Sequence, residues 1–78
     1  MKLEAYNKAF IEGLDIKPEI SLDSLKFNEI DEWDSIGHMS LMSALEEAFD
    51  ISLETDDIVD FSSYVKGKEI LKKYNIDI

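Results

Sequence analysis

Residues 34–50 read Asp-Ser-Ile-Gly-His-Met-Ser-Leu-Met-Ser-Ala-Leu-Glu-Glu-Ala-Phe-Asp, and this stretch decides the fold that the sequence predicts. Its apolar residues recur at steps of three and four, which places them on one face of a helix. That stripe consists of Leu41, Leu45, Ala48 and Phe49, with Met42 beside it. Asp34 and Ser35 are residue types that favour a helix N-cap, and a carboxylate there suits the helix dipole. The sequence therefore predicts a long amphipathic helix that begins at Ser35.

Another helix is predicted near the beginning of the chain, where Leu3, Tyr6, Phe10 and Leu14 keep the same period. Because Gly13 weakens a helix and Pro18 cannot continue one, we expect this helix to end near Leu14 or Asp15. The stretch from 15 to 34 has no clear period, yet it is long for a structureless loop. We expect an ordered loop with a helical turn near residues 22–25. Apolar side chains spread along it would hold it to the core: Ile16, Ile20, Leu22, Leu25, Phe27 and Ile30.

Two more helices are predicted after residue 50. Residues 54–61 favour a short acidic helix with Ile58 and Phe61 facing inward. Ser62 or Ser63 would cap a last helix that carries Tyr64, Ile70, Leu71 and Tyr74. Residues 51–53 alternate as a strand does, but no other segment offers a partner strand. With 78 residues the chain suits one domain, so we expect a single all-α domain over residues 1–78, with three longer helices and one short helix.

Charge is distributed unevenly along the chain. Eight lysines, no arginine and 18 carboxylates give a formal charge of −10, which excludes the basic surface that a nucleic-acid binder needs. All the lysines lie before Phe27 or after Val65. Between these positions lie Glu29, Asp31, Glu32, Asp34, Glu46, Glu47, Asp50, Glu54, Asp56, Asp57 and Asp60. This acidic centre is either a solvated surface or a docking surface for basic partners, and charge alone leaves both interpretations open.

The residue types in the chain also argue against several kinds of functional site. The chain has no cysteine and a single histidine, which excludes disulfides, cysteine metal sites and multi-histidine metal sites. Glu54, Asp56, Asp57 and Asp60 could attract divalent cations loosely, but no pattern indicates a dedicated metal site. An EF-hand register with Gly37 at position six fails, because it places Ile36 and Ser43 where an oxygen ligand and a glutamate are needed. A Ser35–His38 catalytic pair lacks a G-x-S-x-G elbow, and we expect His38 to lie exposed on the helix surface. Apolar runs of at most three residues predict neither a membrane span nor a signal peptide, and thus a cytoplasmic protein.

The stretch that predicts the long helix also resembles the prosthetic-group site of acyl carrier proteins. That family has Asp-Ser-Leu at the start of a helix, where this chain has Asp34-Ser35-Ile36. The resemblance continues through residues 44–50, the short acidic helix and the capped last helix, and it covers about residues 30–74. It implies an acyl-carrier-protein-like four-helix bundle with a long ordered loop between the first and second helices. It also implies a 4′-phosphopantetheine arm on the Ser35 hydroxyl, beside Asp34, transferred from coenzyme A by a partner enzyme.

What the resemblance implies about function is a free-standing, monomeric carrier with no catalytic activity of its own. Acyl intermediates would be held on the arm as thioesters. The partners would be a phosphopantetheinyl transferase and acyl-transferring, acyl-activating or condensing enzymes with basic docking surfaces. Fatty-acid synthesis and a specialised polyketide, peptide or surface-sugar pathway both remain open. The alternative function is an acidic helical adaptor that binds basic partners without a prosthetic group.

A second Asp-Ser-Leu occurs at residues 23–25, and there it matches the family letter for letter. We choose Ser35 because no long amphipathic stripe follows Ser24. The chain departs from the common fatty-acid carriers at Gly37 and Ser40, where those proteins have acidic residues. Both positions belong to the family's docking helix, so the set of partners can differ.

Two further groups of residues follow from the resemblance. The positions that match or neighbour the family's docking residues are Ile36, Met39, Glu46, Glu47, Asp56 and Asp60. For Ile36 and Met39 the alternative is ordinary core packing. In the family an acyl chain can fold back into the bundle, and the corresponding lining here would be Met42, Leu45, Leu53, Ile58, Phe61 and Leu71. For these residues the alternative is a plain hydrophobic core.

Overall fold

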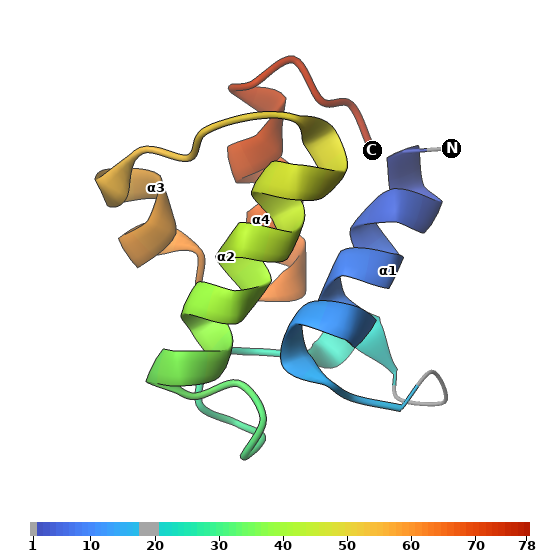
Figure 1. The fold of residues 1–78 in the computed structure, drawn as a ribbon, viewed down its shortest axis with the longest axis vertical. Helices are drawn as coiled ribbons and strands as arrows, with labels where there is room; N and C mark the ends of the chain where they lie inside the picture. Colours follow the sequence, from blue (N-terminus) through green and yellow to red (C-terminus); the bar gives the residue numbers. More distant parts are fainter. Residues whose placement is uncertain (1, 18–20) are drawn as a thin grey trace.

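A computed structural model describes residues 2–17 and 21–78 of the chain. Over these ranges the chain forms four α-helices and one short 3₁₀ helix, and no strand. The elements are α1 (Lys2–Leu14), η1 (Leu22–Ser24), α2 (Ser35–Phe49), α3 (Thr55–Asp60) and α4 (Tyr64–Lys72). Figure 1 shows their order along the chain. The predicted all-α fold class is confirmed, with three longer helices and one short one.

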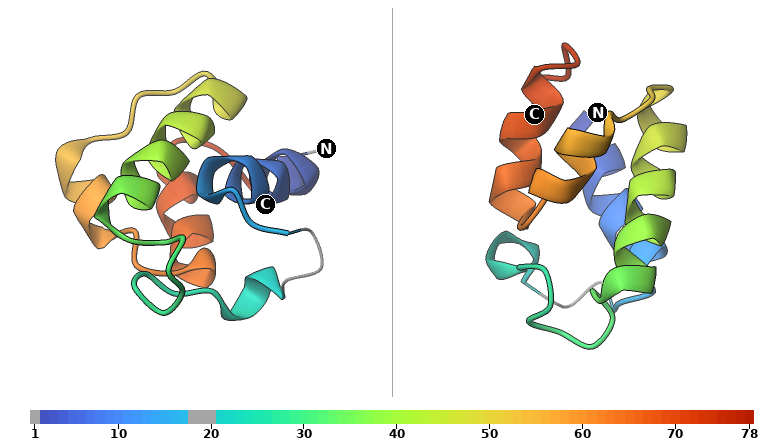
Figure 2. Two further views of the ribbon diagram at one scale, coloured as in Figure 1. Left: turned by 60° about the horizontal axis from the view of Figure 1, so that its bottom comes forward. Right: turned by 90° about the vertical axis from the view of Figure 1, so that its left-hand side faces the viewer.

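Helix α2 lies at the centre of the arrangement, with α1 on one side and the short α3 on the other (Figures 1 and 2). Helix α1 packs closely along α2, and a Cβ atom added to Gly13 would lie only 2.8 Å from the Leu41 Cα atom. The first helix ends at Leu14, as the sequence predicts. Asp15 follows in the left-handed conformation that commonly terminates a helix.

The core is rich in aromatic side chains. Trp33, Tyr6, Phe10 and Phe61 are its largest fully buried residues, and the ring of Phe10 contacts the other three. The Tyr6 hydroxyl donates a 2.6 Å hydrogen bond to the Tyr64 carbonyl oxygen, which joins α1 to α4. Burial, together with the nearby Tyr64, raises the pKa of Tyr6 far above its ordinary value, so the hydroxyl stays protonated as a donor.

The predicted apolar stripes are correct except at their ends. Leu41 and Leu45 are buried, and Phe49 is half-buried, but Ala48 is exposed and its assignment to the buried face is wrong. Leu3 is likewise exposed on α1. Ala48 faces an open hollow between α1 and α2, and Leu3 lies in the first turn of α1; periodicity alone does not indicate where neighbouring helices leave such a gap.

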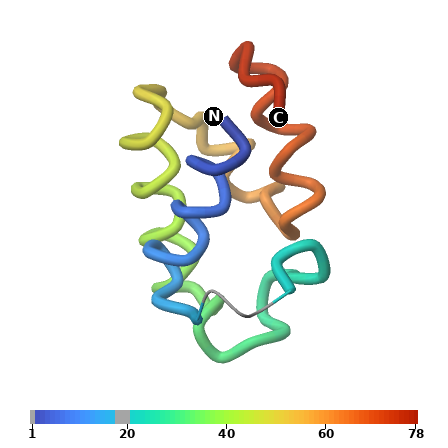
Figure 3. The backbone as a smooth tube through the Cα atoms, turned by 90° about the vertical axis from the view of Figure 1, so that its right-hand side faces the viewer, coloured from blue at the N-terminus to red at the C-terminus, as the bar shows by residue number. Residues whose placement is uncertain are grey.

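The loop between α1 and α2 is pinned to the rest of the fold in the way that the sequence predicts. Its helical turn forms at η1, Ile16 and Leu25 are buried, and Leu22 and Ile30 are half-buried. Phe27 is exposed, while Ile20 and Pro18 lie outside the described residues. An antiparallel bridge joins Lys26 to Ser63, and the Phe27 N–H donates to the Ser62 carbonyl oxygen at 2.8 Å. Figure 3 shows η1 close to the start of α4, with the chain after η1 passing below the helices towards α2.

Candidate functional site

The start of α2 has the cap that the sequence predicts. The Asp34 carboxylate accepts a 2.8 Å hydrogen bond from the Gly37 N–H, and the Asp34 carbonyl oxygen accepts one from the His38 N–H at 2.7 Å. Immediately before the cap, Trp33 is completely buried and fixes the direction in which the chain enters the helix. Ser35, the first helical residue, is exposed. The structure therefore presents the Ser35 hydroxyl at a firmly anchored helix terminus.

Gly37 is required by the backbone that lies against the first turn of α2. A Cβ atom at this position would come within 1.9 Å of the Glu32 carbonyl oxygen. Because the obstacle is backbone, no side-chain rotation relieves such a clash. The way in which the preceding loop folds over the helix therefore leaves no room for a side chain at position 37.

A hollow of about 410 Å³ adjoins Ser35, between the start of α2, helix α3 and the preceding loop. Apart from the two serines and the imidazole of His38, its lining is apolar. The lining residues are Phe27, Ser35, His38, Met39, Ile58, Val59, Phe61 and Ser62. An exposed hydroxyl and an apolar hollow therefore occupy one site.

His38 is not the exposed residue that the sequence predicts. Its side chain is half-buried, with Nδ1 accepting a 2.9 Å hydrogen bond from Trp33 Nε1. Its Nε2 lies 2.8 Å from the Ile58 carbonyl oxygen and must donate to it, since a carbonyl oxygen only accepts. Both ring nitrogens are engaged, so the imidazole has no nitrogen left to take a proton from Ser35. This role could not be predicted from the sequence, because both hydrogen-bond partners, Trp33 and Ile58, lie outside α2.

The two apolar candidates for docking are both exposed. Ile36 has 82% of its surface accessible and Met39 has 53%, so the alternative of core packing is wrong for each. Val59 on α3 is 74% exposed and lines the same hollow as Met39, although sequence reasoning did not single it out. Ile36 and Met39 are three residues apart on α2 and share a face. These residues form an exposed apolar surface beside Ser35.

The acidic docking candidates divide into two kinds. Glu47, Asp56 and Asp60 are exposed, as a docking role requires. Glu46 is half-buried, and its Oε2 atom accepts a 2.7 Å hydrogen bond from the Leu53 N–H. Glu46 thus ties the segment after α2 back to the helix, which gives it a structural role whether or not it also meets a partner.

Asp57 is an acidic residue that sequence reasoning left among the surface charges, yet it is buried. Its carboxylate accepts hydrogen bonds from the Lys73 ammonium and from the Tyr74 hydroxyl, each 2.5 Å long. These hydrogen bonds, that from Lys73 first, lower the pKa of Asp57, and the same contact raises the pKa of Lys73. Of the acidic residues at the centre of the sequence, Asp34, Glu46 and Asp57 therefore have structural roles.

The residues predicted to line an acyl-chain cavity belong to the core or pack against it. Met42, Leu45 and Leu71 are at most 1% exposed, and Leu53 is also buried. The structure places only two of the six predicted residues, Ile58 and Phe61, on the hollow beside Ser35. The other four are buried in the core and are absent from the lining of this hollow.

The second Asp-Ser-Leu has different surroundings. Ser24 ends the three-residue η1, and its hydroxyl donates a 3.1 Å hydrogen bond to the Ser21 carbonyl oxygen. Leu25 follows in an extended conformation, so no long helix begins here. Of the two serines, only Ser35 stands in the first turn of a long helix.

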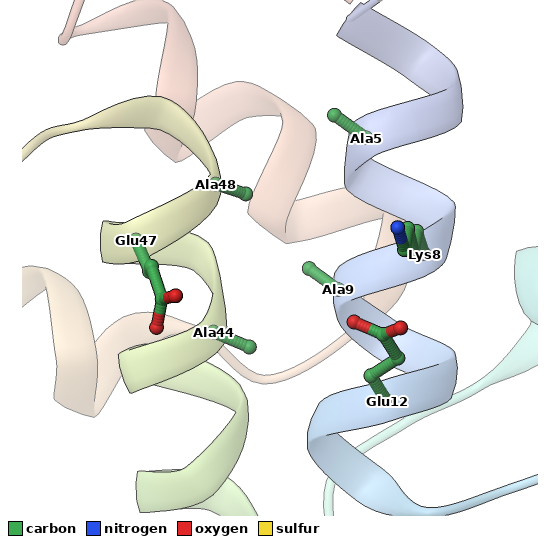
Figure 4. Close-up of a pocket in the computed structure, with 7 residues that line it drawn as sticks. All are labelled: Ala5, Lys8, Ala9, Glu12, Ala44, Glu47 and Ala48. Carbon is green, nitrogen blue, oxygen red and sulfur yellow. The ribbon is translucent and has the colours of Figure 1, made fainter.

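A further hollow, of about 370 Å³, lies between α1 and α2 (Figure 4). Alanine side chains from both helices face each other across it, with Lys8, Glu12 and Glu47 around them. Ser35 and the residues predicted to line the acyl-chain cavity are absent from its lining. We therefore assign the candidate site to the hollow at Ser35.

Comparison with known protein families, with curated proteins and with solved structures gives no match to this chain. Within residues 2–17 and 21–78, no helix is long and apolar enough to cross a membrane. Over the same ranges, no three potential metal-ligating side chains come together. The functional interpretation therefore rests on the residues and geometry of the site at Ser35.

Proposed function

We propose that this protein is a free-standing acyl carrier that bears a 4′-phosphopantetheine arm on Ser35. The observation that carries the proposal is the placement of an exposed Ser35 hydroxyl, capped by Asp34, at the rim of the apolar hollow. The proposal includes an acyl-carrier-protein-like bundle, a single carrier domain and a monomer in the cytoplasm. When bound, the arm supplies a terminal thiol that carries acyl groups as thioesters.

The residues around Ser35 suit a phosphodiester at that position. An anion in the first turn of a 15-residue helix interacts favourably with the positive end of the helix dipole. The Asp34 carboxylate is already engaged by the Gly37 N–H, so its role is to hold the turn in place. The exposure of Ser35 leaves its hydroxyl accessible to a phosphopantetheinyl transferase, which supplies the catalytic groups that this chain lacks.

The exposed residues beside Ser35 support recognition by partner enzymes. Ile36, Met39 and Val59 offer an apolar contact area, and Glu47, Asp56 and Asp60 offer negative charge on the same two helices. Opposite charge on a partner speeds encounter, whereas apolar contacts in the centre of an interface provide affinity. Partners with basic docking surfaces, such as acyl-transferring or condensing enzymes, match this combination.

The hollow at Ser35 also bears on the cargo. A short acyl group finds apolar side chains there without any change in the core. A longer chain would have to enter the core, where Met42 and Leu71 are fully buried. Met42 has an adaptable side chain, but opening the core breaks van der Waals contacts between core side chains. The methylene groups of the acyl chain would have to replace those contacts. We therefore expect short acyl groups to be the preferred cargo.

Two other functions fit the site less well. A serine hydrolase needs a base for Ser35, and both nitrogens of His38 are already engaged. An acidic adaptor without a prosthetic group would use the same exposed acids, but it gives no reason for a serine at the mouth of an apolar hollow.

One experiment tests the carrier role directly. The purified protein is incubated with coenzyme A, Mg²⁺ and a phosphopantetheinyl transferase of broad specificity, and its intact mass is measured. The proposal predicts a gain of one phosphopantetheinyl group per chain. An unchanged mass, under conditions in which a known carrier is fully modified, favours the adaptor.

A further inference from the structure

Helix α3 is attached to the rest of the fold in an unusual way. Of its six residues, only Asp57 is buried and only Ile58 is half-buried, while the other four are exposed. Little apolar surface therefore holds this helix, and its polar contacts carry more of the attachment. Towards the segment after α4 these are the hydrogen bonds of Asp57 to Lys73 and Tyr74. Towards α2 the attachment is the hydrogen bond between His38 Nε2 and the Ile58 carbonyl oxygen.

His38 joins three parts of the chain at one point. It lies on α2, accepts from the Trp33 indole of the preceding loop, and donates to Ile58 of α3. This arrangement fixes the neutral imidazole with its proton on Nε2, because Nδ1 must keep a lone pair for the indole N–H. A second proton on Nδ1 would point at that N–H, and the hydrogen bond from Trp33 would be lost.

No charged group near His38 compensates for that loss. The rings of Phe27, Trp33 and Phe61 surround the imidazole, with centroid distances of 5.1, 6.2 and 6.3 Å. The charged residues on the elements around it are Lys26, Glu29, Asp31, Glu32, Asp34, Asp56, Asp57 and Asp60. None of them forms a hydrogen bond or an ion pair with the imidazole, and Asp57 is turned towards Lys73.

We propose that His38 is a proton-controlled latch: the neutral imidazole holds α3 and the Trp33 loop against α2, and its protonation releases α3. Because His38, Ile58 and Val59 all line the hollow at Ser35, release widens that hollow. The hydrogen bonds between Asp57 and the segment after α4 persist, so α3 swings away from α2 while its other attachment holds. The latch acts in the unmodified chain and does not depend on the carrier role.

The chain is well suited to a direct test, because it contains one tryptophan and one histidine. In NMR spectra of the unmodified protein, the single indole N–H reports on the Trp33–His38 hydrogen bond, and the single imidazole reports its own protonation. Hydrogen-exchange protection is measured for the indole N–H and for the backbone amides of 58–60, the part of α3 whose N–H groups have acceptors within the helix or its cap. The range is from about pH 7.5 to about pH 5.5, where histidine changes its charge. Protection is expressed relative to intrinsic exchange at each pH.

The proposal predicts that the protection factors of the indole N–H and of the α3 amides both fall by roughly five- to tenfold, which corresponds to the loss of about one hydrogen bond. Both falls should have the same midpoint as the titration of the imidazole. The variant His38→Gln, which cannot titrate, should show no such pH dependence. Should that variant fail to fold, the coincidence of the two midpoints in the wild-type protein remains decisive. Protection that is unchanged across the imidazole titration, that changes with a different midpoint, or that falls equally in His38→Gln overturns the proposal.

Discussion

The ammonium of Lys73 donates a 2.5 Å hydrogen bond to the carboxylate of Asp57, and so joins α3 to the segment that follows α4. The Asp57 side chain is only 6% exposed, whereas that of Lys73 is 63% exposed. Tyr74 completes the cluster, since its hydroxyl donates to Asp57 and accepts from the Glu54 N–H. These contacts hold both the start and the middle of the short helix.

The cluster of Asp57, Lys73 and Tyr74 predicts how the free energy of unfolding depends on pH. Because Lys73 lowers the pKa of Asp57 from its ordinary 3.8, the stabilisation is fully present above about pH 4 and is lost as the pH falls through the lower folded-state value. Lys73 behaves in the opposite sense. Its pKa is raised from 10.5, so its contribution is present below that value and is lost as the pH rises through the higher one.

Urea denaturation between about pH 6 and pH 2 measures the predicted loss of stability at low pH. Asp57→Asn should be less stable than wild type at pH 6, and the difference should shrink towards pH 2. Asp56→Asn, which alters an exposed neighbour on the same helix, should leave the curve nearly unchanged. If both variants follow the wild-type curve, the Asp57–Lys73 contact contributes nothing to stability.

The second prediction concerns Gly37, because replacing it with alanine has two opposite effects on stability. Alanine should favour the helix by about 1 kcal/mol, but its Cβ atom would lie 1.9 Å from the Glu32 carbonyl oxygen. We expect the clash to dominate and Gly37→Ala to lose about 1–3 kcal/mol of unfolding free energy. Ser43→Ala, at an exposed position of the same helix, should be neutral or slightly stabilising. A Gly37→Ala protein more stable than wild type contradicts the close approach of the loop.

Neighbouring glutamates on α2 provide a matched pair for the third prediction. Glu46 accepts from the Leu53 N–H at 2.7 Å, whereas Glu47 is exposed. Glu46→Ala should therefore cost about 1–2 kcal/mol in chemical denaturation, because a charge-assisted hydrogen bond is lost. Glu47→Ala should stay within about 0.5 kcal/mol of wild type. Equal effects of the two variants would show that the Glu46 hydrogen bond does not stabilise the turn after α2.

Much of this fold could be predicted from the sequence, because periodicity and capping residues act locally. The Asp34 cap, the start of α2 at Ser35, the Ser63 cap of α4 and the end of α1 all follow from neighbouring residues. These features depend on backbone groups within one or two turns, which is the range over which sequence patterns carry information.

The roles of His38 and Asp57 could not be predicted in the same way. Each depends on a partner brought close by the tertiary fold: Ile58 lies 20 residues from His38, and Lys73 lies 16 residues from Asp57. Sequence patterns place a polar helix residue on the surface unless such a partner is known. The burial of Trp33 could not be predicted either, because this residue lies in a loop without hydrophobic periodicity.

The proposed docking surface leads to the fourth prediction. Reversing Glu47 and Asp60 to lysine should slow modification by a phosphopantetheinyl transferase by roughly tenfold at low salt, since electrostatic attraction raises association rates. The matched control reverses Glu4 and Glu12, two exposed acids of α1, and so changes the net charge equally. Rates follow from intact mass against time, with circular dichroism to establish that both variants keep their helices. Equal slowing in the two double variants would point to net charge and not to a docking surface on α2 and α3.

The proposed carrier function requires that Ser35, and not Ser24, bears the prosthetic group. The most direct measurement is peptide mapping by mass spectrometry after treatment with coenzyme A and a phosphopantetheinyl transferase, on wild type, Ser35→Ala and Ser24→Ala. We predict one phosphopantetheinyl group on Ser35 in the wild type, the same group in Ser24→Ala, and none in Ser35→Ala. A modified Ser35→Ala protein, or a wild-type protein modified at Ser24, would contradict the account.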